Sequence, residues 1–337
     1  MRLLFFTMVI VGMGVVMGHE GHEGRPAGKV VSSVQLTGNG AFVFETVPGW
    51  GAMPEGANLG PTHGGVAVDG SGHVYVSTEA DHGVVKFTKD GKHVKNFGPV
   101  SKALHSLEVV KEGEREVLLG AAVKRQKVLK MDLEGAVLLE IPNETTGEIP
   151  GGFKGVTAVT MSPDGHLFVV CGYGSNQIHK FDAGGKLLKS AGGRGNGEGR
   201  FTTCHGVTFD GRWEKHPRLL VCDRENRRLV HLDLDLNFKN VHARNLRRPC
   251  AVSIRGWHAA VAELEGRVTI LGGKGEPIAF LGDQPNKELW AKKPIPEGQL
   301  FDGLFTSPHG LSWDNEGNIV VQDWNVTGRV TKLKRVK

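Results

Sequence analysis

The stretch HGVTFD at residues 205–210 begins a unit that recurs along the chain, and the copies of this unit decide the fold. Similar apolar segments open all of the units, at GGVAVD (64–69), HSLEVV (105–110), TAVTMS (157–162), HGVTFD (205–210), CAVSI (250–254) and HGLSWD (309–314). A turn follows each opening segment. Glycine in these turns supplies the positive φ that a hairpin requires, as at Gly72, Gly165 and Gly317.

Three further strands are expected after each opening segment. In the third unit they are the apolar LFVVC (167–171), the alternating IHKF (178–181) and the glycine-turned GKLLKSAG (185–192). Repeats of roughly 40–60 residues with four strands are typical of propeller blades. The sequence therefore predicts an all-β chain folded as a six-bladed β-propeller.

The last unit ends after its third strand, close to the end of the sequence. Near the other end, AFVFETVPGWG (41–51) has the pattern of a fourth strand. We expect this N-terminal strand to complete the last blade and close the ring, because closure removes an exposed sheet edge.

Composition and the first residues bear on location and partners. Residues 1–18 have the pattern of a cleaved secretory signal, with Arg2 followed by an apolar run shorter than the roughly 20 residues needed to cross a bilayer. We therefore expect a secreted or periplasmic protein without a membrane span. A flexible His/Gly-rich segment (19–38), with His19 and His22, would precede the propeller (39–337). Its two histidines could also bind copper or zinc.

Two chain-wide features limit the function classes. The net charge of +5 is spread along the chain without basic blocks, which argues against nucleic-acid binding. In an exported chain, the four cysteines allow one or two disulfides.

Alignment of the opening segments places one residue of each blade at the entrance of the axial channel. In order these residues are Gly64, His105, Thr157, His205, Cys250 and His309. The three histidines come from alternate blades, about 120° apart around the axis, so their side chains should converge. Three imidazoles with a free fourth position are typical of a catalytic zinc site. Copper, iron or another divalent ion is the alternative.

Counting back from the third strands defines a second ring of residues at the same entrance. Its members are Glu79, Val123, Tyr173, Arg224, Glu263 and Trp324. Tyr173 is a candidate catalytic residue, since it would stand one blade from both His105 and His205, although a tyrosine at a strand end can also serve packing. Arg224 could contact a substrate or could equally be a repeat residue that bonds its neighbour. Glu79, Glu263 and Trp324 are candidates for substrate binding, although the two glutamates could equally be salt-bridge partners.

The repeats resemble the NHL-repeat family of propellers, with its marks in GGRGNGEGRFTTCHGVTFDG (192–211) and VCDRENRRLVHLD (221–233). From about residue 42 to 333 the chain resembles one six-bladed enzyme family, the peptidyl-α-hydroxyglycine α-amidating lyases. That resemblance is sharpest in the following segments: CGYGSNQIHKF (171–181), GRFTTCHGVTF (199–209), CDRENRRL (222–229) and FTSPHGLSWDNEGNIVVQDW (305–324).

The resemblance implies a zinc ion held by the His of blades two, four and six, which match His105, His205 and His309. It also implies that Tyr173 is the base and that Arg224, in the DREN motif, is catalytic. The implied reaction removes the proton of a substrate α-hydroxyl, breaks the carbinolamide C–N bond and releases glyoxylate and an amide.

Two positions depart from that family. Glu79 stands where the family has an Arg, so the anchor for a substrate carboxylate is replaced by a negative charge. Gly310 stands where the family has an Asp that binds a structural calcium, so Ca²⁺ is a doubtful cofactor here.

Three functions are compatible with these residues. The first is an exported zinc-dependent lyase that acts on a small hydroxylated or peptide-like substrate. The second is a non-catalytic NHL propeller that binds a protein partner or a small ligand on its face. The third is a lactonase-like hydrolase that uses a metal with Glu79 or Glu263. A propeller fold alone does not decide among them.

Overall fold

The computed structural model describes residues 34–143, 149–213, 215–295 and 297–336, which lie in the compact unit Ser32–Lys337. The predicted signal sequence (1–18) and most of the segment 19–38 lie outside the described residues. Among the described residues, no helix has the length and apolar character needed to span a membrane.

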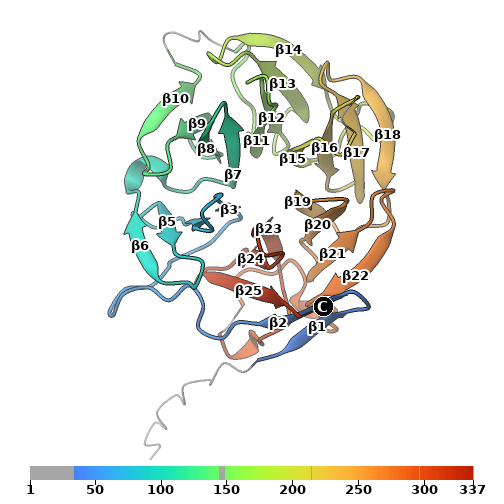
Figure 1. Ribbon diagram of the computed structural model, residues 1–337. Coiled ribbons are helices and arrows are strands. Elements are labelled where there is room, and N and C mark those ends of the chain that lie inside the picture. Colours follow the sequence, from blue (N-terminus) through green and yellow to red (C-terminus); the bar gives the residue numbers. More distant parts are fainter. Residues whose placement is uncertain (1–33, 144–148, 214, 296, 337) are drawn as a thin grey trace, which may run out of the picture. The chain divides into compact units, whose positions relative to one another are not determined.

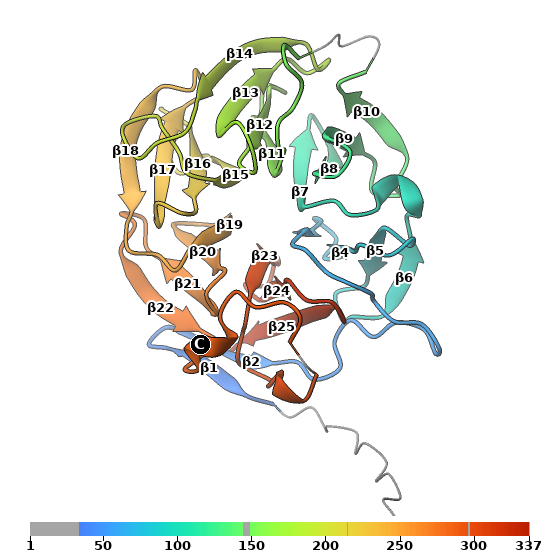
Figure 2. The same cartoon turned by 180° about the vertical axis from the view of Figure 1, so that it is seen from behind.

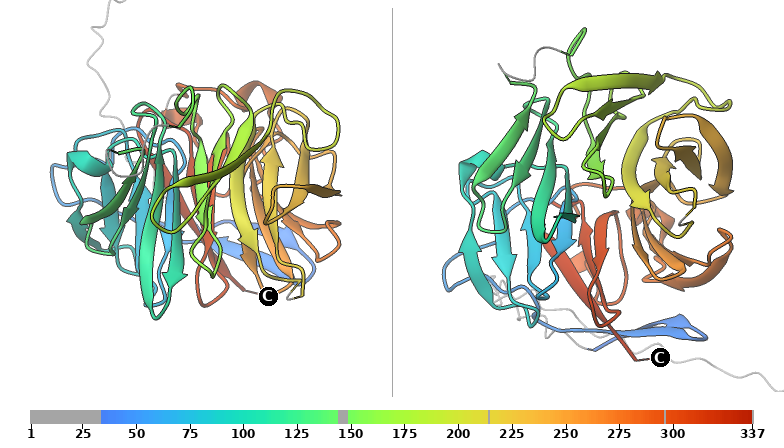
Figure 3. Two further views of the ribbon diagram at one scale, coloured as in Figure 1. Left: turned by 90° about the horizontal axis from the view of Figure 1, so that it is seen from above. Right: turned by 45° about the horizontal axis from the view of Figure 1, so that its top comes forward.

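Six antiparallel sheets surround a central axis, as seen from the two sides in Figures 1 and 2. In the side view of Figure 3 (left), many strands run along the axis of the ring. The all-β class and the six-bladed propeller are confirmed. Helical structure in the described residues is limited to three 3₁₀ turns, η1 (Pro99–Ser101), η2 (Lys287–Leu289) and η3 (Glu297–Gln299).

The first five blades have four strands each. Blade one contains β3 (Val66–Val68), β4 (Val74–Ser77), β5 (Val84–Phe87) and β6 (His93–Asn96). Blade two contains β7 (Ser106–Glu112), β8 (Arg115–Ala122), β9 (Lys127–Met131) and β10 (Val137–Ile141). Blade three contains β11 (Ala158–Met161), β12 (Leu167–Cys171), β13 (Gln177–Phe181) and β14 (Leu187–Gly192). Blade four contains β15 (Cys204–Asp210), β16 (Arg218–Asp223), β17 (Arg228–Asp233) and β18 (Phe238–Ala243). Blade five contains β19 (Pro249–Arg255), β20 (His258–Glu263), β21 (Arg267–Leu271) and β22 (Pro277–Leu281).

The sixth blade joins strands from both ends of the sequence. Its order is β23 (Pro308–Trp313), β24 (Ile319–Asp323), β25 (Arg329–Arg335), β2 (Phe42–Thr46) and β1 (Leu36–Asn39). β2 pairs antiparallel with β25, with Thr46 opposite Leu333. β1 forms a fifth, outermost strand (Figure 1), and it begins within the segment that the sequence analysis expected to be flexible.

The core consists of apolar clusters that bridge neighbouring blades. One cluster joins Phe44 of β2 to Leu281 of β22 and Val321 of β24, and all three side chains are fully buried. Because each cluster contains side chains from adjacent sheets, apolar burial fixes the angle between blades as well as each blade itself. The first strand of every blade is thereby held against the axis.

Buried carboxylates at the ends of second strands fix the segments that lead into the axial strands. Asp223 pairs with Arg228 at 2.7 Å and accepts a hydrogen bond from the backbone N–H of Thr202. In the sixth blade, Asp323 pairs with Arg329 at 3.0 Å and accepts from the N–H of Ser307 at 2.7 Å. Thr202 and Ser307 lie just before His205 and His309, so these carboxylates help position the site.

Candidate metal centre

The structure brings together the three imidazoles that the repeat alignment selected. His105 directly precedes β7, His205 lies on β15 and His309 lies on β23. Their ring centroids are 4.7 Å apart for His105–His205, 4.9 Å for His105–His309 and 4.6 Å for His205–His309. All three side chains are buried.

A fourth imidazole, His63, lies against two of these rings and was not anticipated from the sequence. Its centroid is 4.8 Å from that of His105 and 4.9 Å from that of His309. The signal was the His-Gly pair itself: HGGVAVD (63–69) repeats HGVTFD (205–210) with one additional glycine. Alignment on the strand residues hid the histidine one position upstream of the ring.

The candidate ligand atoms form two overlapping groups within the described residues. One nitrogen each of His63, His105 and His309 lie within 4.8 Å of one another. One nitrogen of His205, one of His309 and the Sγ of Cys250 form a second group with the same spread. His309 belongs to both groups, so the two groups adjoin each other at this residue.

The neighbouring blades fix the protonation of two of these rings. His105 Nδ1 lies 2.8 Å from the carbonyl oxygen of Thr157, and His205 Nδ1 lies 2.8 Å from that of Cys250. A carbonyl oxygen only accepts, so each Nδ1 carries the hydrogen and each Nε2 keeps a free lone pair. A hydrogen-bonded Nδ1–H with a free Nε2 is the usual arrangement of a metal-ligating histidine.

Tyr173 places its hydroxyl between these two lone pairs. The oxygen lies 3.1 Å from His105 Nε2 and 2.9 Å from His205 Nε2, and Arg224 Nη1 donates to it at 3.2 Å. One hydroxyl hydrogen serves only one of the two acceptors. Lone pairs therefore outnumber protons at this point, and a bound cation would satisfy them.

His309 lacks the corresponding hydrogen bond. Its Nδ1 is buried and has no hydrogen-bond partner among the described residues. A buried polar atom without a partner is costly in a folded protein. The neutral imidazole nitrogens gathered in this buried place make the cluster a good fit for zinc or another metal with affinity for imidazole.

The imidazoles are neutral near pH 7. Burial lowers the pKa of His105, His205 and His309 well below the usual range. Burial also lowers the pKa of His63 to about 4, with help from the charges of Lys293, Lys124 and Arg224. Neutral imidazole is the form that binds metals, so little free energy is needed to remove protons before binding.

Tyr173 is affected in the opposite direction. Burial raises the pKa of Tyr173 to about 12, and the charge of Arg224 offsets only part of that rise. The residue as a whole is 40% exposed. Its ring therefore has an open side, while its hydroxyl faces the imidazoles.

Glu79 and Trp324 both contact His63. Glu79 Oε1 lies 3.1 Å from His63 Nδ1, and its Oε2 lies 3.8 Å from Lys124 Nζ. Trp324 stacks on the His63 ring with a centroid separation of 5.5 Å and an interplanar angle of 19°. Lys293 lies 5.0 Å above the Trp324 ring. The negative charge of Glu79 is therefore engaged within the site and balanced by a neighbouring lysine.

Glu263 has a different environment from the one that the second ring predicted. The backbone N–H of Leu264 donates to the carbonyl oxygen of Arg248, just as the N–H of Arg224 donates to that of Thr203. Leu264 is therefore the residue of blade five that is equivalent to Arg224. Glu263 is fully buried one residue earlier and pairs with Arg267 at 2.6 Å. The turn before β21 is one residue shorter than the turn before β17. Counting back from the third strand by the same number of residues therefore reaches Glu263 instead of Leu264. We therefore leave Glu263 out of the candidate substrate site.

The structural calcium site of the α-amidating lyases does not fit this chain. A Cβ on Gly310 would collide with the carbonyl oxygen of Gly64, so no Asp side chain can be placed there without moving the backbone. The one or two disulfides that the sequence allowed are not formed, because Cys171, Cys204, Cys222 and Cys250 are all buried free thiols. Burial raises the pKa of Cys250 to about 11.

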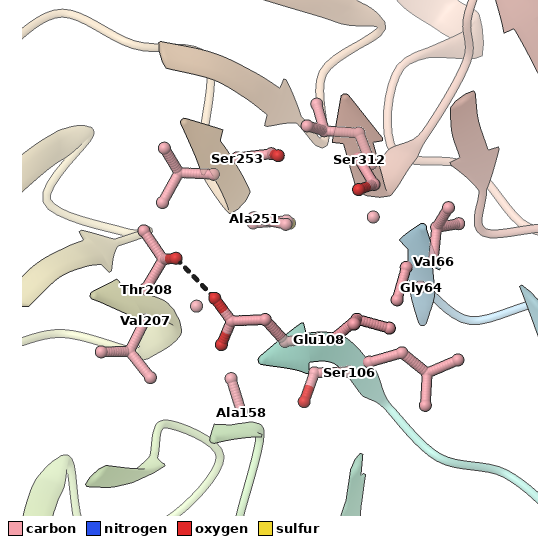
Figure 4. Close-up of a pocket in the computed structure, with 18 of the residues that line it drawn as sticks. Gly64, Val66, Ser106, Glu108, Ala158, Val207, Thr208, Ala251, Ser253 and Ser312 are labelled. Atoms are coloured by element: carbon pink, nitrogen blue, oxygen red, sulfur yellow. Dashed lines mark hydrogen bonds between the residues drawn. The ribbon is translucent and has the colours of Figure 1, made fainter. Parts of the chain in front are cut away.

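Behind the imidazoles, a cavity of about 460 Å³ follows the axis between the first strands of the six blades. Figure 4 shows labelled side chains from several blades around it, with a hydrogen bond of 2.7 Å from Thr208 to Glu108. The second carboxylate oxygen of Glu108 is buried without a partner among the described residues. Burial raises the pKa of Glu108 to about 7. The repeat pattern gives no signal for this residue.

The fold and the site thus define a six-bladed β-propeller with a cluster of imidazoles at one end of its axial channel. No protein-family model matches the chain, and no curated protein matches it. Among solved structures, a gluconolactonase from Xanthomonas campestris has a TM-score of 0.62 and 12% identity, with 92% of this chain and 99% of that chain covered. Virginiamycin B lyase from Staphylococcus aureus has a TM-score of 0.54 and 14% identity, with 90% and 100% covered.

A streptogramin B lyase is similar to the same extent, with a TM-score of 0.54, 13% identity, and 82% of this chain and 94% of that chain covered. At such identities the likeness establishes the shared fold. The chemistry of this chain has to be argued from its own residues.

Proposed function

We propose that this chain is an exported, zinc-dependent lyase of the NHL-propeller type, similar to the peptidyl-α-hydroxyglycine α-amidating lyases. The observation that carries the proposal is the Tyr173 hydroxyl, which lies within 3.1 Å of the Nε2 atoms of both His105 and His205. A tyrosine in that position contacts whatever the imidazoles bind. The imidazole cluster would hold the metal, and a small hydroxylated or peptide-like molecule would be the substrate.

A zinc ion bound there would act as a Lewis acid toward a substrate oxygen and lower the pKa of its hydroxyl. Tyr173 would accept that proton as tyrosinate, because its oxygen is directed at the same point as the two Nε2 lone pairs. The charges of the bound zinc and of Arg224 would lower its pKa from about 12, so that the hydroxyl loses its own proton beforehand. Arg224 donates to the Tyr173 hydroxyl and lies 5.3 Å from the centroid of its ring. This contact orients the hydroxyl and stabilises its ionised form.

The charges at the entrance favour a substrate that carries a negative group. Glu79 is held by His63 and Lys124, so its charge is not free to repel a carboxylate. Lys293 lies above Trp324, and its charge acts on His63 together with those of Lys124 and Arg224. These cations would supply the attraction that the family obtains from an arginine at the position of Glu79.

Two measurements test the proposal. Purified protein should contain about one zinc per chain, and the metal should be lost in His205→Ala but kept in His166→Ala, which removes an imidazole from a turn far along the sequence. An α-hydroxyglycine peptide should release glyoxylate, and Tyr173→Phe should reduce kcat by about 10²–10⁴-fold. The only other tyrosine, Tyr75, provides the matched control, because it is buried and bound to Asp69 at 2.8 Å.

The outcomes separate the alternatives. Stoichiometric metal without glyoxylate release would refute an α-hydroxyglycine peptide as the substrate, with Glu79 as the suspected reason. Hydrolysis of a lactone would then identify a hydrolase. Absence of tightly bound metal would refute the enzyme altogether and leave a propeller that binds a protein or ligand on its face.

A further inference from the structure

His63 contacts two of the three repeat histidines as closely as the three contact one another. Its centroid distances of 4.8 Å to His105 and 4.9 Å to His309 lie within the 4.6–4.9 Å range found among the trio. One of its nitrogens lies within 4.8 Å of a nitrogen on each of those residues. The symmetry of alternate blades requires only three histidines, so this additional ring calls for its own explanation.

Contacts on two sides hold the His63 ring in place. Its Nδ1 lies 3.1 Å from a carboxylate oxygen of Glu79, which accepts the Nδ1 hydrogen and leaves the lone pair on Nε2. Trp324 covers one face of the ring at 5.5 Å and nearly parallel. A carboxylate that orients the far nitrogen of an imidazole is the usual support of a metal-ligating histidine.

We infer that His63 is a fourth imidazole ligand of the metal, supplied by the first blade and positioned by Glu79. This inference rests on the metal centre of the proposed function and adds a ligand to it. Glu79 thereby acquires a role as a positioning residue for His63. Lys124 provides the balancing charge on the other oxygen of Glu79, at 3.8 Å.

A fourth protein ligand has a consequence for access to the metal. Zinc sites with four protein ligands are closed, whereas catalytic sites keep one position for water or substrate. With His63 bound, a small oxygen ligand would have to displace this imidazole or add to it. Removal of His63 should therefore open a position on the metal.

X-ray absorption at the zinc edge of the purified, zinc-loaded full chain tests this directly. The wild-type protein should show four imidazoles around zinc, and His63→Ala should show three imidazoles with an oxygen ligand in place of the fourth. His82→Ala is the matched control, because His82 lies on the same blade but bonds to the carbonyl oxygen of Leu59 at 2.9 Å. It should keep all four imidazoles.

Zinc affinity provides a second measurement that does not depend on turnover. Competition with a chromogenic chelator should show that Glu79→Ala weakens zinc binding about 10–100-fold, because the support of His63 is lost. His63→Asn, which keeps a polar side chain of similar size, guards against a folding defect in the alanine variant. It should also show three imidazoles.

The results distinguish this inference from the function on which it rests. Three imidazoles in the wild type, unchanged in both His63 variants, would overturn the fourth ligand and leave the zinc enzyme standing. A wild-type protein that binds no zinc would overturn both proposals.

Discussion

Gly64 has a backbone conformation and a neighbour that exclude any side chain. Its φ is +132°, which L-residues rarely adopt, and a Cβ at this position would collide with Nδ1 of His309. Its N–H also donates to the side chain of Gln322, in the neighbouring blade. The absence of a side chain at Gly64 is therefore a requirement of the imidazole cluster.

Gly64→Ala should consequently displace His309 and strain the backbone. We expect the free energy of unfolding of the metal-free protein to fall by about 1–3 kcal/mol, the usual cost of overpacking. Zinc affinity should fall as well. Urea unfolding in the presence of chelator and a zinc titration measure the two effects separately. Gly197→Ala has open space around its Cβ and should change neither; equal losses in both variants would contradict the argument.

Glu108 should make the stability of the protein depend on pH. Its pKa is about 7 in the folded state, raised from the ordinary 4.5 chiefly by burial. Between these pH values the unfolded chain releases a proton that the folded protein retains. Stability should therefore fall as pH rises from about 4.5 to about 7 and stay level above it, by up to about 3 kcal/mol in total.

Glu108→Gln should remove this component, so that its unfolding midpoint in urea exceeds that of the wild type at pH 8 and approaches it at pH 5. Glu114→Gln, on the exposed turn between β7 and β8, should retain the wild-type dependence. Identical pH profiles for wild type and Glu108→Gln would show that this carboxyl group ionises normally in the folded protein.

In three blades, a carboxylate at the end of the second strand is bonded to the segment that precedes the first, axial strand of the same blade. Asp223, Asp323 and Glu263 occupy this place in blades four, six and five. Each pairs with an arginine at the start of the third strand, at 2.6–3.0 Å. The same carboxylates accept hydrogen bonds from the backbone N–H groups of Thr202, Ser307 and Arg247.

Asp323→Ala should be strongly destabilising, because Arg329 would remain largely buried without its carboxylate. Breaking one partner of a buried pair costs about 3–5 kcal/mol. Since Ser307 would also lose its acceptor just before His309, zinc affinity should fall with stability. Thermal unfolding followed by circular dichroism measures the first effect. Asp81→Ala breaks the exposed pair with Lys102 and should leave the melting temperature unchanged; similar losses in both would refute a special role for the buried pair.

The repeats allowed the fold and the histidine trio to be predicted, because turn glycines and alternating apolar residues recur in every blade. The predictions failed where one blade differs in length by a residue. The additional glycine in HGGVAVD (63–69) concealed His63, and the shorter turn before β21 assigned Glu263 to a position that Leu264 occupies. Glu108 could not be predicted from the repeats, because no other blade has a glutamate at the equivalent position of its first strand. Sequence periodicity locates equivalent positions in the blades, whereas the candidate site also contains residues at which the blades differ.

The pairing of β2 with β25 joins the two ends of the described chain into one sheet and leaves β1 at its outer edge. The side chain of Phe44, on β2, is fully buried in the cluster between blades five and six, 6.2 Å from the ring of Trp313. Trp313 ends the strand that carries His309. Closure of the ring and placement of His309 therefore depend on the same packing.

Phe44→Ala should lower the free energy of unfolding by about 3–5 kcal/mol, the cost of removing a buried phenylalanine. Because the last blade connects the first and fifth, we expect the loss to appear as one shifted transition rather than as separate unfolding of the sixth blade. Tryptophan fluorescence and circular dichroism in urea should give the same midpoint, lower than that of the wild type. Leu36→Ala, 69% exposed on β1, should leave the midpoint unchanged. Two separate transitions in Phe44→Ala would mean that the sixth blade opens independently, so that the β2–β25 pairing closes the ring without coupling its blades.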